Sequence, residues 1–337
     1  MNIREIARLA NVTPGTVSKV LNNYPDISEA TRAHVRQIIE ENQYTPAFGS
    51  KFSGSGSTAN LVGMVIEGAN NALYDDLYQD LSTRLHNAEY TILSYTDNFF
   101  MQDKTEKFEE ILKYLNAHKL SGFVYFGGNF AGVSPELFDK LPCPTIFVNT
   151  VLPVSFSDTN YSSINTNHYD CGKRQMELLI EKGHKNIALM ISSLNDNSVY
   201  GLRMEGYKDA LAAAGLTGNL KNVAEGWYLM ARSYSELKKL LEKHPEITAV
   251  CVSADVMTPA VLRVLHDLRK TPGKDVDVIS YDGLEYLEYS IPRVTGFVQP
   301  VKEMAEGVYD LLMGLINKER SHQHIIFQSK YVKRETL

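Results

Sequence analysis

The hydrophobic pattern of the chain changes once, close to residue 60. Before that point apolar residues recur at the spacing of short amphipathic helices, and after it continuous apolar runs alternate with helical segments. Residues 3–10 place apolar side chains at i, i+3, i+4 and i+7, namely Ile3, Ile6, Ala7 and Ala10. This spacing predicts a short helix with one apolar face.

Two further helices follow, each opened by a capping hydroxyl. Thr13 and Pro14 predict the start of the second helix, because a threonine hydroxyl caps a helix well and proline is tolerated at the first helical position. Ser28 is expected to cap a third helix over about 29–42. Three helices joined by tight turns predict a helix-turn-helix DNA-binding unit. The inward side chains are expected to be Val17, Val20, Leu21, Ala30, Val35 and Ile38 or Ile39.

Composition alone does not decide whether this unit binds DNA. Residues 1–52 carry six Lys/Arg and five Asp/Glu, and a net charge of about +1 is a weak electrostatic footprint for DNA. The whole chain has a formal net charge of −6. From composition, a small helical subdomain without a ligand remains the alternative.

Residues 60–337 show the alternation of strands and helices that is typical of α/β proteins. Strands are predicted at 61–66, 90–95, 122–126, 145–148, 187–191, 249–252, 276–280 and 294–298. Helices are predicted over about 74–88, 103–117, 167–182, 203–214 and 233–243. This order predicts parallel sheets covered on both faces by helices. Because the segment is too long for one sheet, we expect two α/β lobes.

Ligands of open parallel sheets bind outside the carboxyl ends of the strands. The residues that follow the predicted strands are rich in Asn, Asp, Ser and aromatic side chains, which suits a polyhydroxylated ligand. These segments are 67–73, 127–130, Asn149, 192–197, 253–255 and 281–282.

Other classes of protein are disfavoured. The N-terminus has the charged helix described above instead of a signal peptide, and no apolar run approaches a membrane span, which argues against an exported binding protein. Cys143, Cys171 and Cys251 are an odd set without metal-ligand spacing, as expected for reduced cytoplasmic thiols. Phosphate-binding loops, zinc helices and nucleophile elbows are not found in the sequence. We therefore expect a cytoplasmic non-enzyme without a metal or cofactor.

The N-terminal sequence closely resembles the LacI/GalR family of bacterial transcriptional repressors. The resemblance rests on IREIARLANVT at 3–13, TVSKVLNN at 16–23, ISEATR at 27–32 and YTP at 44–46. It extends less tightly into the core, at 163–165, 179–188, 203–207, 280–282 and 298–301. The resemblance implies a head at 1–46, a linker at 47–59, and an effector-binding and dimerisation domain at 60–337 that resembles a type I periplasmic binding protein.

By position, the resemblance implies that Pro14, Gly15 and Lys19 face base edges in the major groove. Thr16, Ser18 and Asn22 would bond phosphates and fix the register. Because Pro14 and Gly15 replace the longer polar side chains often found there, only Lys19 reaches far, and a solvated helix face is the alternative for Thr16 and Ser18. The whole set of expected DNA contacts is Arg4, Thr13, Pro14, Gly15, Thr16, Ser18, Lys19, Asn22, Tyr44, Lys51 and Phe52.

The linker departs from the family, in which a short helix inserts a leucine into the minor groove. Ala47, Ser50 and Ser53 stand where the family resemblance places Asn, Ala and Leu, and glycine recurs between 49 and 56. Each glycine costs about 0.8–1 kcal/mol in a helix relative to alanine, so the composition favours a flexible tether. Phe52 could serve as the minor-groove wedge. Alternatively, Phe48 and Phe52 pack against the heads or the core.

The resemblance also implies the effector contacts. Arg203 and Asp282 are the best candidates and Asn149 is the best from the first lobe, with an interlobe ion pair or a capping role as the alternative. Asp255 follows Ala254, which replaces the family's usual asparagine, so the commonest sugar-binding pose is not expected. Tyr74 completes the expected site from the first lobe, where its hydroxyl departs from the family's usual phenylalanine. Trp227 and Tyr228 are expected either to stack on a sugar ring or to pack in the core.

These observations predict a DNA-binding transcriptional regulator, expected to be a repressor that binds a pseudo-palindromic operator as a homodimer. A small-molecule effector, expected to be a carbohydrate or a sugar derivative, would control it by altering the separation of the heads. Induction is favoured over co-repression, although nothing in the sequence fixes the direction of coupling. The alternative is a cytoplasmic sugar-binding sensor that acts as an activator or responds to a non-sugar effector.

Overall fold

The computed structural model describes residues 3–21, 28–41, 60–67, 72–97, 103–153, 159–196 and 198–337. The chain divides into two compact units, Met1–Thr58 and Ala59–Leu337, each described here by itself. Within the described ranges, no helix combines the length and hydropathy that a membrane span requires.

The first unit contains the three predicted helices, α1 (Ile3–Leu9), α2 (Pro14–Leu21) and α3 (Glu29–Glu41). Asn11 adopts a left-handed conformation with φ of 51° and turns the chain between the first two helices. The Thr13 and Ser28 hydroxyls accept hydrogen bonds from backbone N–H groups three residues later, at 3.1 and 3.2 Å, which confirms both predicted caps. Ala30 was predicted to face inward but is exposed. The small core consists of Ile6, Ala7, Ala10, Val17, Val20 and Val35.

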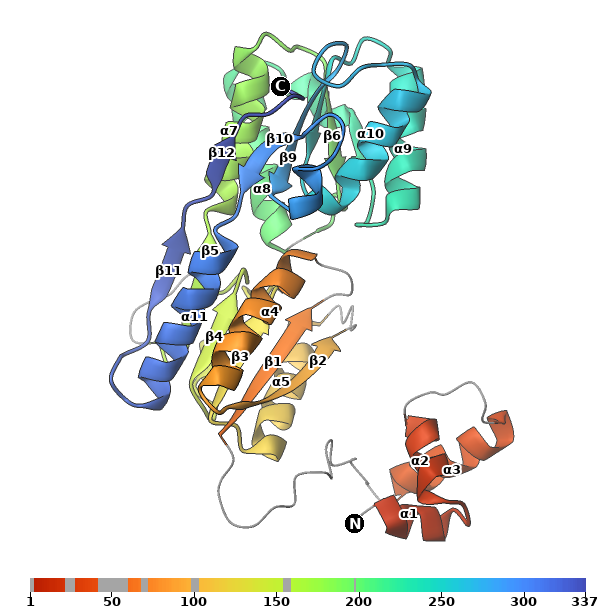
Figure 1. Ribbon diagram of the computed structural model, residues 1–337, viewed down its shortest axis with the longest axis vertical. Coiled ribbons are helices and arrows are strands. Elements are labelled where there is room, and N and C mark those ends of the chain that lie inside the picture. Colours follow the sequence, from red (N-terminus) through yellow and green to blue (C-terminus); the bar gives the residue numbers. More distant parts are fainter. Residues whose placement is uncertain are drawn as a thin grey trace. The chain divides into compact units, whose positions relative to one another are not determined.

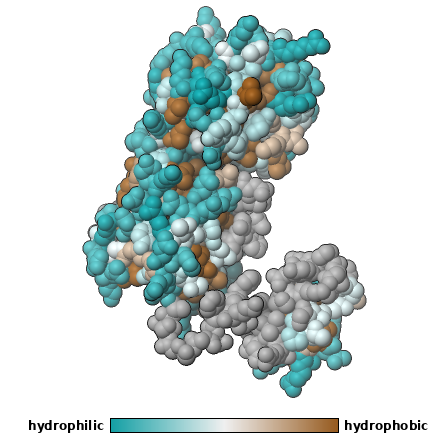
Figure 2. Space-filling view, viewed as in Figure 1, coloured by the Kyte–Doolittle hydropathy of each residue, from teal (hydrophilic) through white to brown (hydrophobic). Residues whose placement is uncertain are grey.

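The second unit has two lobes, each built around a six-stranded sheet. Lobe 1 comprises residues 60–166 and 301–327, and lobe 2 comprises residues 168–298 and 330–337. The chain crosses between them at residues 166–168, 298–301 and 327–330 (Figure 1). In the view of Figure 2, hydrophilic residues cover most of both lobes and hydrophobic residues form small patches.

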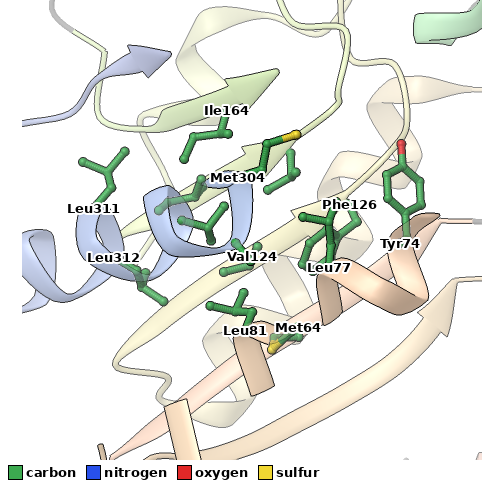
Figure 3. Packing of buried hydrophobic residues seen from close by; sticks show 14 of the residues in the cluster. Met64, Tyr74, Leu77, Leu81, Val124, Phe126, Ile164, Met304, Leu311 and Leu312 are labelled. Carbon is green, nitrogen blue, oxygen red and sulfur yellow. The ribbon is translucent and has the colours of Figure 1, made fainter. Parts of the chain in front are cut away.

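Lobe 1 has the strand order β11-β5-β4-β3-β1-β2, with every pairing parallel. The strands are β1 (Leu61–Glu67), β2 (Thr91–Asp97), β3 (Gly122–Phe126), β4 (Thr145–Val148), β5 (Ser162–Thr166) and β11 (His324–Phe327). Helices α4 (Ala72–Asn87) and α11 (Val301–Ile316) cover one face. Figure 3 shows Leu77 and Leu81 of α4 and Leu312 of α11 packing with Val124 of β3. The other face is covered by α5 (Lys104–His118) and α6 (Pro135–Phe138).

Lobe 2 has the strand order β12-β10-β9-β8-β6-β7. The strands are β6 (Ile187–Ile191), β7 (Val223–Glu225), β8 (Ala249–Val252), β9 (Asp277–Asp282), β10 (Thr295–Val298) and β12 (Lys330–Val332). Helices α7 (His168–Glu181) and α8 (Val199–Ala213) cover one face, and α9 (Met230–Lys243) and α10 (Thr258–Asp267) cover the other. Short 3₁₀ turns lie at η1 (Thr217–Lys221), η2 (Asp255–Met257) and η3 (Glu285–Leu287).

The predicted fold class is confirmed, with one local difference. Strand β12 pairs antiparallel to β10, whereas parallel sheets were predicted. The carboxyl ends of the two sheets face each other, so a strand that continues from β11 directly into lobe 2 must run against its neighbours. The crossover geometry thus explains the one antiparallel pair described in these sheets.

Candidate DNA-binding head and effector site

Val17 and Val20 pack helix α2 against the other two helices of the head, and they are 0% and 1% exposed. Thr13 and Pro14 are exposed at its start, and Thr16 is half-buried. The Thr13 and Thr16 hydroxyl oxygens lie 2.9 Å apart. The capping arrangement therefore already engages both hydroxyls, which limits them as free phosphate contacts.

The other expected DNA contacts cannot be placed. Asn22, Tyr44, Lys51 and Phe52 lie outside the described residues. The backbones of four more are described, but their side chains lie outside the description: Arg4, Gly15, Ser18 and Lys19. The linker, including Phe48, is outside it as well. The DNA-facing residues therefore remain a prediction.

A cavity of about 450 Å³ lies between the two lobes, at the carboxyl ends of their strands. We call it the interlobe cavity. Both lobes contribute to it, and hydroxyl and charged side chains dominate its polar lining. The polar residues include Lys104 and Asn129 from lobe 1 and Ser192, Ser193, Asp196, Ser198, Tyr200 and Ser253 from lobe 2. Its position agrees with the rule that parallel sheets bind ligands at their carboxyl ends.

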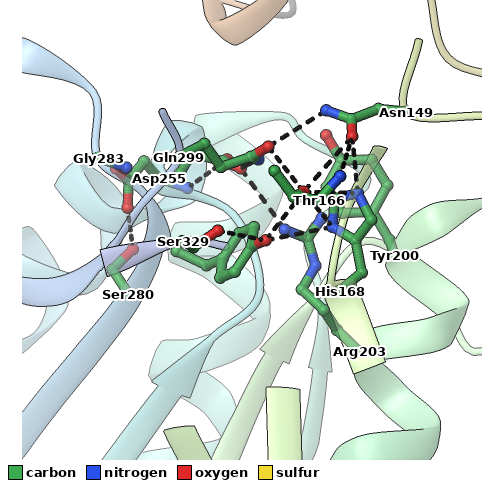
Figure 4. Close-up of polar contacts among 12 residues, drawn as sticks. Asn149, Thr166, His168, Tyr200, Arg203, Asp255, Ser280, Gly283, Gln299 and Ser329 are labelled. Carbon is green, nitrogen blue, oxygen red and sulfur yellow. Dashed lines mark hydrogen bonds and ion pairs between the residues drawn. The ribbon is translucent and has the colours of Figure 1, made fainter. Parts of the chain in front are cut away.

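Behind this cavity a buried hydrogen-bonded network connects the lobes (Figure 4). Asn149, which follows β4, donates from Nδ2 to Oε1 of Gln299 at 3.2 Å. Gln299 in turn donates from Nε2 to Oδ1 of Asp282 at 2.8 Å. Asn149 also accepts the Thr166 N–H at 3.0 Å through Oδ1. Because Thr166 and Gln299 belong to two crossovers, Asn149 ties lobe 1 to both of them.

Arg203 ends this network in lobe 2 and is only 1% exposed. Its guanidinium carbon lies 4.0 and 4.1 Å from the ring centroids of Tyr200 and Tyr281, so two tyrosines enclose the cation. Its NH1 atom is 3.5 Å from Oδ1 of Asp282. Among the described residues, no acceptor reaches its buried Nε atom. A buried guanidinium stays charged, so Asp282 is needed to balance it.

A close contact between α7 and α8 positions Arg203. A Cβ atom on Gly172 would lie 2.5 Å from the Arg203 carbonyl oxygen, and one on Gly206 would lie 2.3 Å from the Tyr169 carbonyl oxygen. Larger residues at either glycine would separate the helices. The two glycines thus allow α8 to bring Arg203 to the crossover.

Asp255 is buried beside Asp282 and holds the turn after β9. Its Oδ2 atom accepts the N–H groups of Gly283 and Leu284 at 2.7 and 2.8 Å, and its Oδ1 atom accepts the Ser280 hydroxyl. Burial, together with the charge of Asp282, raises the pKa of Asp255 to about 7. Asp255 therefore acts first as a structural acceptor for this turn.

His168 joins the network from the first residue of α7. Its Nε2 atom lies 3.0 Å from Oδ1 of Asn149, and its Nδ1 atom lies 3.3 Å from the Tyr281 hydroxyl. An Nε2–H donor to Asn149, with Nδ1 accepting from Tyr281, satisfies both contacts with a neutral ring. Burial and the nearby Arg203 charge hold the pKa of His168 well below its ordinary value of 6.5.

The stability of the core should depend on pH through His168. The unfolded chain binds a proton near pH 6.5 that the folded ring resists. The free energy of unfolding should therefore fall as pH drops below that value, by up to about 1.4 kcal/mol per pH unit. Urea unfolding across this range should show a smaller slope for His168→Gln. The exposed His266→Gln variant is the matched control, and equal slopes for wild type and His168→Gln would contradict the assignment.

The aromatic candidates occupy three different environments. Tyr74 is 3% exposed, and its hydroxyl lies 3.4 Å from the Asn149 carbonyl oxygen. Tyr228 donates its hydroxyl proton to Oδ2 of Asp196 at 2.6 Å. Trp227 is 47% exposed, with the Arg232 guanidinium 5.2 Å from its ring centroid. Tyr74 thus belongs to the buried network, Tyr228 supports a residue that lines the cavity, and Trp227 faces outward.

Comparison with known proteins gives this architecture a family. Residues 2–47 match the model of bacterial regulatory proteins of the lacI family, and residues 176–337 match that of the periplasmic binding protein-like domain. The chain belongs to the LacI family of transcriptional regulators. It is thus an effector-controlled DNA-binding regulator of a non-enzyme family.

Relatives of this LacI-family regulator match it over nearly their whole length. The transcriptional regulator MalR of Clostridium butyricum is 27% identical over 100% of this chain and 99% of its own. Catabolite control protein A of Priestia megaterium is also 27% identical, over 97% and 96%. Among solved structures, the CelR–cellobiose complex has a TM-score of 0.68 at 24% identity, covering 100% of this chain and 99% of that one. The lac repressor dimer bound to operator and the anti-inducer ONPF has a TM-score of 0.67 at 21% identity, covering 100% and 98%.

None of the seven expected effector residues lines the interlobe cavity of this LacI-family regulator. Five of them form the connected network behind it: Tyr74, Asn149, Arg203, Asp255 and Asp282. Neither His168 nor Tyr200 was expected from the sequence as a site residue. Gln299 directly follows β10, so the strand-end rule could have identified it, whereas His168 and Tyr200 at the starts of helices gave no comparable signal.

Proposed function

We propose that this regulator is a repressor that binds a pseudo-palindromic operator as a homodimer and releases it when a carbohydrate binds the interlobe cavity. The observation that carries the proposal is the cavity itself, which lies where the two lobes meet and is lined by both of them. The lac repressor is described as a dimer on operator, and CelR as a complex with cellobiose. These likenesses support the proposal, while the effector of this chain is inferred from the lining.

The lining suits a neutral polyol. The Ser253 hydroxyl has no hydrogen-bond partner among the described residues, so it can both donate and accept. The Ser192 and Ser193 hydroxyls donate to Asp196 and Glu225, which leaves their oxygens as acceptors for a ligand. Tyr200 adds a flat ring on the same wall, and this ring also contacts the Arg203 guanidinium. A sugar in the cavity would therefore touch a residue that stacks directly on the buried network.

This contact gives a route from effector to heads. Asn149 is tied to two of the three crossovers, so a change in the Tyr200–Arg203 packing would alter the angle between the lobes. In a dimer, that angle would set the separation of the two heads and hence their fit to an operator with matching two-fold symmetry. We assign the reading of base edges to α2, with Lys19 as the residue that reaches furthest, and we keep the other expected DNA contacts and the boundaries 1–46, 47–59 and 60–337 as proposals.

Operator affinity should respond to carbohydrates. After selection of an operator from random duplex DNA, a panel of mono- and disaccharides should contain a compound that weakens binding by about 5- to 150-fold, the range of a coupling free energy of about 1–3 kcal/mol. Fluorescence anisotropy with labelled operator measures the release, and calorimetry on the same compounds measures binding to the protein.

Two outcomes would contradict the proposal. No preference for any duplex over random competitor, at any ionic strength, would remove the DNA-binding role. A carbohydrate that binds but tightens the operator complex would replace induction with co-repression.

A further inference from the structure

A second cavity lies in lobe 1, at the end of the sheet opposite to the interlobe cavity. We call it the basal cavity; its volume is about 670 Å³. Its lining comes from the segments that precede β4 and β5 and from the end of α11 with the loop that leads to β11. Since parallel sheets usually bind ligands at their other end, this cavity requires evidence of its own.

The charged side chains that line the basal cavity are all positive. Lys318 and Arg320 line it, and the described lining contains no aspartate or glutamate. Within the described part of the chain neither cation forms an ion pair, although Glu319 lies between them in sequence. The interlobe cavity differs, because Asp196 and Glu205 line it together with two lysines, and Glu205 pairs with Lys208. The basal cavity is therefore the one suited to an anion.

Local packing holds Arg320 in place. A Cβ atom on Gly314 would lie 2.7 Å from both Cγ and Cδ of Arg320, so the arginine stem lies flat over this glycine of α11. The N–H groups of Glu319 and Arg320 both bond the Gly314 carbonyl oxygen, at 2.8 and 3.1 Å. The guanidinium is thus carried on an ordered turn at the cavity rim.

Two neutral polar groups add to the cations. His322 lines the cavity and its Nδ1 atom lies 3.0 Å from the Ser162 hydroxyl oxygen, which also accepts the Gln323 N–H at 3.2 Å. If Ser162 donates its own proton to Nδ1, the ring proton sits on Nε2 as a further donor. Burial lowers the pKa of His322, which keeps the ring neutral. Among the described residues, no donor reaches the buried Oδ1 atom of Asn160 in the same wall.

The volume of the basal cavity and the apolar part of its wall fit an organic molecule better than a bare inorganic ion. Leu141 and Leu315 line the cavity beside two prolines, Pro142 and Pro144. A volume of about 670 Å³ lies within the range of small-molecule sites, which is roughly 300–1,000 Å³. The occupant should therefore carry an anionic group for the cations and a body with hydroxyls for the remaining space.

We propose that the basal cavity binds a phosphate ester of a small polyol, with its phosphate held by Lys318 and Arg320 and a hydroxyl donated to Asn160. Lysine and arginine together suit a phosphate dianion, because arginine binds phosphate through paired N–H groups and lysine adds a compact charge. The site is separate from the interlobe cavity, so it does not depend on the carbohydrate proposed there.

Cys143 provides a readout specific to this cavity. It lines the cavity and is partly exposed, whereas Cys171 and Cys251 are buried elsewhere. Burial raises the pKa of Cys143 to about 11, so its alkylation is slow enough to follow by hand mixing. An occupant should therefore protect one identifiable thiol, and the two buried thiols serve as internal references.

The experiment uses the full-length protein without DNA or carbohydrate. N-ethylmaleimide labelling of Cys143 is followed by peptide mass spectrometry in the presence of glycerol 3-phosphate, inorganic phosphate or glycerol. We expect glycerol 3-phosphate to slow labelling at least fivefold, inorganic phosphate to slow it less, and glycerol to leave it unchanged. The Lys318→Gln/Arg320→Gln double variant should require at least tenfold more glycerol 3-phosphate, while exposed Lys185→Gln on lobe 2 should behave as wild type.

A second measurement avoids the thiol. Calorimetry of Cys143→Ser with glycerol 3-phosphate should still show binding, and thermal unfolding checks that the double variant folds. Protection by glycerol alone, protection that survives in the double variant, or equal protection by inorganic phosphate would overturn the proposal. It would also be overturned if no probe protects Cys143 and calorimetry shows no binding of glycerol 3-phosphate. An operator affinity at least tenfold lower in the double variant would then show that the cations contact DNA phosphates.

Discussion

An Asp282→Ala variant is expected to lose about 3–5 kcal/mol of unfolding free energy, the cost of leaving a buried charge without its partner. Arg203 is 1% exposed and Asp282 is 4% exposed, so water cannot replace the missing carboxylate without opening the site. The same change removes the acceptor of the Gln299 amide and of the Asp255 N–H. Urea unfolding of the full-length protein measures the loss, and the effector response should disappear with it.

A double-mutant cycle separates the ion pair from other effects of the substitution. Arg203→Met/Asp282→Ala should be less destabilising than the sum of its single variants, because removing both partners leaves no unpaired charge. Glu110→Ala breaks the exposed pair with Lys113 and should leave unfolding unchanged within error, since both side chains are more than half exposed. Additive losses at Arg203 and Asp282 would show that the two residues do not stabilise each other.

The sequence predicted those strands that appear as an uninterrupted run of apolar residues. The segments 122–126, 146–148 and 187–191 are continuous apolar runs, and the structure buries each of them completely within a strand. Strand β5, Ser162–Thr166, gave no such signal because most of its buried side chains are polar. Ser162 and Ser163 pair with His322 and His324, more than 150 residues later in the chain. A local pattern cannot reveal a strand whose polar groups are satisfied by so distant a segment.

In the candidate site, too, local patterns predicted some features, whereas contacts between distant segments determine the others. The strand-end rule selected Asn149, Asp255 and Asp282, and the structure does place them together at the carboxyl ends of the sheets. It could not show that they bond to one another instead of lining the cavity, because that depends on Gln299, which lies 150 residues from Asn149. Tyr200 faces the cavity because the α7–α8 contact fixes the position of α8. Such packing has no signature in the spacing of one segment.

The division of the chain into a head and a core leads to a further prediction. Each unit by itself should keep its own binding activity, and the two activities should influence each other only in the full-length chain. The head has its own core around Val17 and Val20, and the chain divides between Thr58 and Ala59. The second unit has hydrophobic cores of its own as well, so each unit holds the packing that its fold needs. Each activity should survive the loss of the other.

Deleting residues 1–46 should abolish specific operator binding, a loss of about 4–10 kcal/mol relative to non-specific DNA, while carbohydrate affinity stays within about twofold of the full chain. The reason is that we assign the reading of base edges to α2, whereas the described lining of the interlobe cavity comes wholly from residues after 100. Within the intact head, Lys19→Ala should cost about 1–3 kcal/mol and flatten discrimination at one base pair. Anisotropy on operator variants and calorimetry on the truncated core measure the two affinities, with Lys185→Ala as a surface control. Operator binding that survives the truncation would place the DNA-reading surface in the core, and a lost carbohydrate affinity would mean that the head helps to build the effector site.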